Sequence, residues 1–128
     1  NVHTIDLSDN NIGAEGAIEL VKHLEGTNLH MLYIGSNQIG TAGSIELAKH
    51  LQGTSVHTLD LHFNQIEDEG MAELAKALLG TRVHTLNLSC NDLEEDEGVI
   101  EFAKYLQSTN VHTLDLSCNY IYPEGAIG

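Results

Sequence analysis

The 128-residue chain is short of basic residues: five Lys and Arg stand against 19 Asp and Glu, for a formal net charge of −14 at pH 7. A chain this acidic repels phosphate groups. We therefore expect neither a nucleic acid nor an anionic membrane as a partner. Two Cys are too few for a fold held together by disulfides. Trp is absent and there is one Pro, so we expect regular structure with short turns. No apolar run approaches the roughly 18 residues that span a bilayer, and no basic-then-apolar leader opens the chain.

What the chain has instead is an internal repeat. The hexapeptide VHTIDL at residues 2–7 returns, with changes, at 29–34, 56–61, 83–88 and 111–116, which are 27 or 28 residues apart. This period predicts four complete units (2–28, 29–55, 56–82 and 83–110) and a partial unit at 111–128. Asn1 stands where Asn28 and Asn110 close earlier units, so we expect a fragment of a longer array.

Each unit is predicted to be one strand followed by one helix. In the third unit Val56, Leu59 and Leu61 alternate with the polar Thr58 and Asp60, which is typical of a half-buried strand. In the second half of each unit, apolar residues recur at the spacing i, i+3, i+4, i+7, which is typical of an amphipathic helix. Neither element covers its own apolar face, so we expect the units to stack as an α/β solenoid with a concave parallel sheet and convex helices, joined by right-handed crossovers.

The strand segment follows the pattern L-x-x-L-x-L-x-x-N-x-L, with the asparagine at positions 10, 37, 64, 91 and 119. Together with the helical segment at 13–24, it resembles the leucine-rich repeats of the ribonuclease-inhibitor subclass. Similar repeats occur in NOD-like receptors and in effectors of intracellular bacteria. The resemblance implies a cytoplasmic protein, or one secreted into a host cytosol, that binds proteins with its concave face. It implies neither an enzyme nor a bound cofactor.

Candidate contact residues occupy the exposed slots of the strand segments, where packing does not dictate the side chain. Most units carry Thr, Asp or Asn, and Ser there, but the second and third units depart with aromatic and other large side chains. Aromatic anchors in an acidic surround are typical of a protein-binding surface for a basic partner. The predicted contact residues are Asp6, Met31, Tyr33, Asp60, His62, Phe63, Asn87 and Asp115.

Two further sets of residues repeat from unit to unit. A histidine occupies the second slot of every unit, at positions 3, 30, 57, 84 and 112, and stacking would place the rings about 5 Å apart. A straight row of imidazoles converges poorly on a metal ion, so a copied turn residue is the favoured interpretation and no metal site is expected. Cys90 and Cys118 also share a slot within disulfide range, but we expect free thiols because the subclass is usually cytosolic.

Three hypotheses for function follow. The favoured one is a non-enzymatic module that binds a protein on its concave face, and the alternative is a structural or engineered scaffold without an evolved ligand. Catalysis is not expected, because Asp60 and His62 have no evident nucleophile beside them.

The acidic run at 92–98 does not match a calcium-binding loop, since Glu97 and Ala103 occupy the positions where such a loop has glycine and glutamate. Uncovered outer strands would favour end-to-end self-association.

Overall fold

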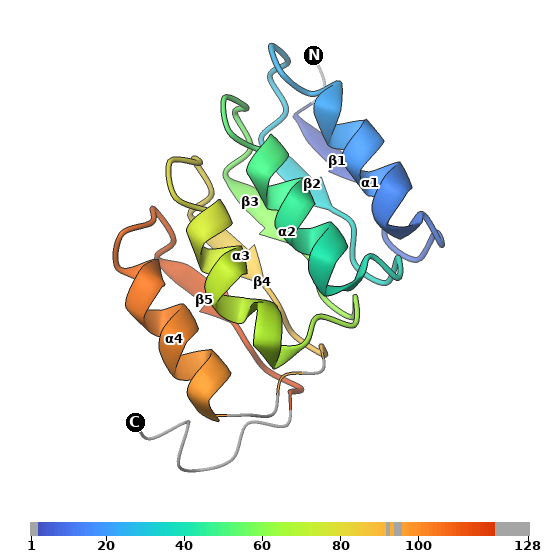
Figure 1. Ribbon diagram of the computed structural model, residues 1–128. Helices are drawn as coiled ribbons and strands as arrows, with labels where there is room; N and C mark the ends of the chain where they lie inside the picture. Colours follow the sequence, from blue (N-terminus) through green and yellow to red (C-terminus); the bar gives the residue numbers. More distant parts are fainter. Residues whose placement is uncertain (1–2, 92, 94–95, 120–128) are drawn as a thin grey trace.

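The computed structural model describes residues 3–91, 93 and 96–119. In this part of the chain five strands alternate with four α-helices, and Figure 1 shows the helices as one layer over the sheet. The strands are β1 (Thr4–Asp6), β2 (Met31–Tyr33), β3 (Thr58–Asp60), β4 (Thr85–Asn87) and β5 (Thr113–Asp115). The helices are α1 (Gly13–Lys22), α2 (Gly40–His50), α3 (Met71–Ala77), which the short 3-10 helix η1 (Asp68–Gly70) precedes, and α4 (Asp96–Leu106).

The strands form a single parallel sheet in the order β1-β2-β3-β4-β5. Its register places Ile5, Leu32, Leu59, Leu86 and Leu114 side by side, one from each unit. The same slot of every unit therefore lies on one line across the sheet. This confirms the predicted fold class of a stacked α/β solenoid.

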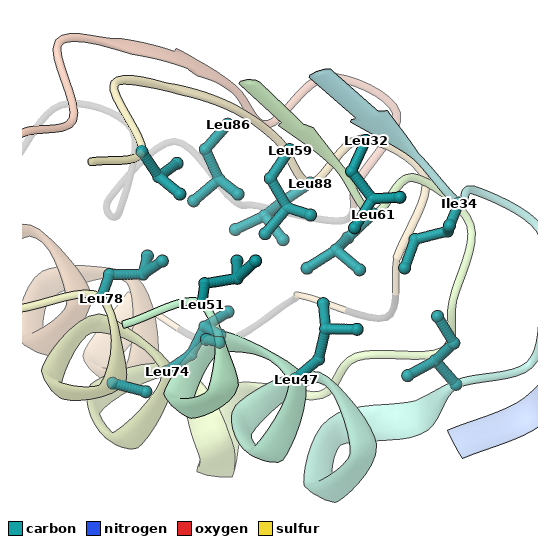
Figure 2. Close-up of a cluster of buried hydrophobic side chains, with 14 of the residues drawn as sticks. Leu32, Ile34, Leu47, Leu51, Leu59, Leu61, Leu74, Leu78, Leu86 and Leu88 are labelled. Atoms are coloured by element: carbon teal, nitrogen blue, oxygen red, sulfur yellow. The ribbon is translucent and has the colours of Figure 1, made fainter. Parts of the chain in front are cut away.

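The hydrophobic core lies between the sheet and the helices (Figure 2). Leucines from the strand segments, such as Leu59 and Leu61, face Leu47 and Leu74 from the helices, and all four are fully buried. At the two ends of the stack Ile5 and Leu114 are only partly buried. Burial thus comes from neighbouring units, as expected for a solenoid.

Buried asparagines join the turns that follow the strands. Asn64 Oδ1 accepts the backbone N–H groups of Asn37 (3.0 Å) and Ile39 (3.2 Å) in the preceding unit, while its Nδ2 donates to the Ile34 carbonyl (3.1 Å). Asn37 and Asn91 make the equivalent bonds one unit before and one unit after. Each side chain satisfies backbone groups that the turn would otherwise leave unpaired in the interior.

The cysteines differ from the prediction. Cys90 and Cys118 form a disulfide, with Cα atoms 4.5 Å apart, so the expectation of free thiols is wrong. The reason is the register: parallel pairing of β4 and β5 places the same slot of both units within bonding distance. The compartment that the resemblance implies was a weaker guide than this geometry.

Two parts of the sequence prediction lie outside the described residues. They are Asp92, Glu94 and Glu95 of the acidic run, and residues 120–128 of the partial fifth unit. Among the helices that the structure describes, none is long and apolar enough to cross a membrane.

Candidate functional site

The exposed face of the sheet carries most of the predicted contact residues in one row. Its register aligns Asp6, Tyr33, Asp60, Asn87 and Asp115, one from each strand. Neighbouring strands lie about 4.8 Å apart, so Tyr33 stands between two aspartates and Asp115 lies three strands from it. We call these five residues the acidic row.

Backbone geometry fixes the carboxylates of the acidic row. Oδ1 of Asp6 accepts the N–H of Ser8 (3.1 Å), and Oδ1 of Asp115 accepts the N–H of Ser117 (2.9 Å). The backbone N–H of Ser8, then its hydroxyl, lowers the pKa of Asp6 below the ordinary 3.8, and the Ser117 hydroxyl, then its N–H, lowers the pKa of Asp115 in the same way. Both groups therefore carry a negative charge at neutral pH.

His62 is held against the sheet by two neighbours. Its Nδ1 lies 2.7 Å from Asp60 Oδ1, which also accepts the backbone N–H of His62 (2.9 Å). The ring covers the buried Gly35 of the adjacent unit, where a Cβ would overlap the ring atoms Cε1 and Nδ1. In three other units this slot holds serine, at positions 8, 89 and 117. Gly35 therefore makes room for His62.

The aromatic residues have different surroundings. The Tyr33 hydroxyl lies 3.5 Å from the Met31 sulfur, so its ring leans along β2 and is partly buried. Phe63 follows β3 in the turn and is 62% exposed. Its backbone is left-handed, with a φ of 53°, which is unfavourable for a bulky residue. Its N–H donates to the Ser89 carbonyl (3.0 Å), so the turn is held in place.

The structure thus brings five predicted residues into one neighbourhood: Asp6, Met31, Tyr33, Asp60 and His62. Phe63 lies beside it in the turn after β3, Asn87 lies one strand further, and Asp115 is at the far edge. The sequence prediction of contact residues omitted Gly35, whose role depends on a contact between units. Its signal was the simultaneous loss of serine at the same slot of two adjacent units.

The histidines of the second slot form a continuous stack, which we call the His ladder. Successive ring centroids from His3 to His112 lie 5.0, 5.4, 4.6 and 4.7 Å apart. Nδ1 of His57, His84 and His112 each lies 2.8 to 2.9 Å from the hydroxyl of the following threonine. No group of three or more His, Cys, Asp or Glu among the described residues is arranged to hold a metal ion.

Comparison with known proteins agrees with the fold. Among solved structures, the chain is similar to "Leiomodin-1 Actin-Binding Site 2 (ABS2)", with a TM-score of 0.80 and 18% identity over 89% of this chain and 69% of that one. No curated protein sequence matches significantly. The family described as "Leucine Rich repeat" matches residues 1–21, 54–75, 82–103 and 107–128, which is more than half of the chain. Such repeats form modules that generally bind proteins and are typically non-catalytic. The chain belongs to the leucine-rich-repeat family.

Proposed function

We propose that this chain is a non-enzymatic protein-binding module whose sheet face contacts a basic protein surface, with Tyr33 and Phe63 as anchors. The observation that carries the proposal is the exposure of the Phe63 side chain. This residue keeps a large apolar ring in solvent, on a left-handed backbone, where the corresponding residue of the first unit is Asp9. Exposure and backbone strain both disfavour phenylalanine here, whereas burial against a partner would offset them.

The distribution of charge supports a basic partner. All four lysines lie on the helices, and each pairs with the glutamate three residues before it at 3.1 to 3.3 Å. Arg82, the fifth basic residue, precedes β4 and is exposed. All five basic residues therefore lie outside the acidic row. Its field attracts a cationic surface, which raises the association rate more than the final affinity.

Leucine-rich-repeat domains generally bind proteins, and the leiomodin-1 structure is named for an actin-binding site. At 18% identity that likeness carries the fold alone, so we do not assign actin to this chain. The proposal for the contact residues depends on their exposure, their register and the charges around them.

The experiment is affinity capture with the double variant Tyr33→Ala, Phe63→Ala. We expect a partner retained by the original chain at moderate salt to be lost by the variant, with unchanged far-UV circular dichroism, because anchor residues carry most of the binding energy. A matched control, Ile100→Ala, removes an exposed apolar side chain from α4 and should leave capture unchanged. Equal capture by the double variant would contradict the proposal.

A further inference from the structure

We propose that Asp6, Tyr33, Asp60 and His62 form a subsite for an arginine side chain of the partner; this inference deepens the proposed function and depends on it. We call these four residues the guanidinium subsite. Asp6, Tyr33 and Asp60 come from three adjacent strands, and His62 follows the third of them.

The two carboxylates flank an aromatic residue. Register places Asp6 on one side of Tyr33 and Asp60 on the other, so the carboxylates are separated by about two strand spacings, roughly 10 Å. The Tyr33 ring leans onto Met31. It therefore does not stand upright between the two carboxylates. A planar cation between them would contact the ring and both carboxylates together.

Asp60 has one carboxylate oxygen committed and one to offer, and the Asp6 carboxylate is held by Ser8. Oδ1 of Asp6 accepts the Ser8 N–H, and Oδ1 of Asp60 accepts the His62 N–H and faces the His62 ring. Both hydrogen bonds to Asp60 end on its Oδ1, whereas the Ser8 hydroxyl also interacts with the Asp6 carboxylate. The backbone therefore fixes the direction in which Oδ2 of Asp60 points, and a ligand pays little to order it.

His62 completes the subsite as a positioning residue. Asp60 is the more buried of the pair, with 15% of its side chain exposed against 33% for His62. With its proton on Nδ1 and donated to Asp60, the ring leaves Nε2 as an acceptor. Gly35 permits this ring position, so both departures from serine serve one arrangement.

Guanidinium fits this set better than ammonium. It is flat enough to lie on an aromatic ring, and its fork of five N–H groups reaches several acceptors at once, whereas ammonium is compact and strongly hydrated. Arg82 is the chain's own arginine, but it precedes β4, whereas His62 follows β3 at the opposite end of these parallel strands. The subsite is thus left for a residue of the partner.

The probe for a direct test is N-acetyl-arginine amide, compared with the lysine and citrulline analogues. A titration followed by ¹H–¹⁵N correlation spectra at pH 7 and physiological salt should shift the amides around residues 6–8, 33–35 and 60–62. Arginine should bind with a millimolar dissociation constant, lysine several-fold more weakly, and the neutral citrulline analogue should cause no shift, because charge and planarity are both required.

Two variants and a control locate the effect. Asp60→Asn should weaken arginine binding by about tenfold, since one charge-assisted contact is lost, and His62→Ser should weaken it by restoring the residue of the other units. Asp115→Asn removes a carboxylate from the far end of the same row and should change little. Equal shifts with lysine, shifts that extend to residue 115, or no shifts at all would overturn the subsite. Partner capture that still requires Tyr33 and Phe63 would then leave the proposed function standing, with another ligand chemistry.

Discussion

At the scale of single residues, the turn that follows each strand imposes a left-handed backbone conformation on one residue. The residue types at this position do not predict that conformation. Asp9, Ser36, Phe63, Cys90 and Cys118 occupy the same slot, and all have φ between 53° and 62°. Aspartate tolerates this region, while a bulky side chain does so at a cost. Phe63 is therefore the residue at which stability and the proposed binding role conflict.

We expect Phe63→Asp to raise the free energy of unfolding by up to about 1 kcal/mol, because it places the residue of the first unit on the left-handed backbone. Chemical denaturation of both chains measures the difference. Ser36→Asp at the same slot of the second unit is the control, and should change stability less because serine is small. A clear loss of stability in Phe63→Asp would mean that packing of the ring outweighs the strain.

At the scale of elements, the His ladder links all five units at the start of the strands. Burial, followed by the charges of His84 and His30, lowers the pKa of His57 below its ordinary value of 6.5. The folded chain thus binds a proton at this site less readily than the unfolded chain does. The contribution of His57 to stability is therefore present in full above about pH 6.5 and is lost as the pH falls through its lowered folded-state pKa.

Replacement of the central ring tests this dependence. We expect His57→Gln to reduce the loss of stability between pH 7 and pH 5, because the group that resists protonation is gone. Thermal unfolding at a series of pH values gives the two slopes. His23→Gln is the control, since this histidine is exposed at the end of α1. Parallel curves for the original chain and His57→Gln would show that the ladder does not govern the acid response.

At the scale of the whole molecule, stability is shared between neighbouring units and is weakest at the ends of the sheet. Leu32, Leu59 and Leu86 are at most 1% exposed, whereas Ile5 and Leu114 in the outer strands β1 and β5 are only partly buried. The hydrogen-bonding edges of β1 and β5 are a template for another chain. The disulfide between Cys90 and Cys118 ties β5 to its neighbour.

We therefore expect the 128-residue chain by itself to associate end to end as its concentration rises. Size exclusion with light scattering over a concentration series measures this, and Thr4→Pro, which introduces a backbone-restricting residue into the edge strand β1, should reduce it. Asp6→Asn, also in β1, is the control that keeps the backbone intact. A monomer at every concentration would contradict the expectation.

The sequence by itself determined the spacing of the strands, the helices of the first four units, their stacking and the parallel register. These follow from apolar periodicity and from repetition, which are local properties copied along the chain. Only the tertiary structure decided that Cys90 is bonded to Cys118, that Phe63 has a left-handed backbone, and that Gly35 accommodates the ring of His62. Periodicity placed the two cysteines in the same slot but did not decide whether their sulfur atoms bond, and it encodes neither the turn conformation that stacking enforces nor a side-chain contact between adjacent units.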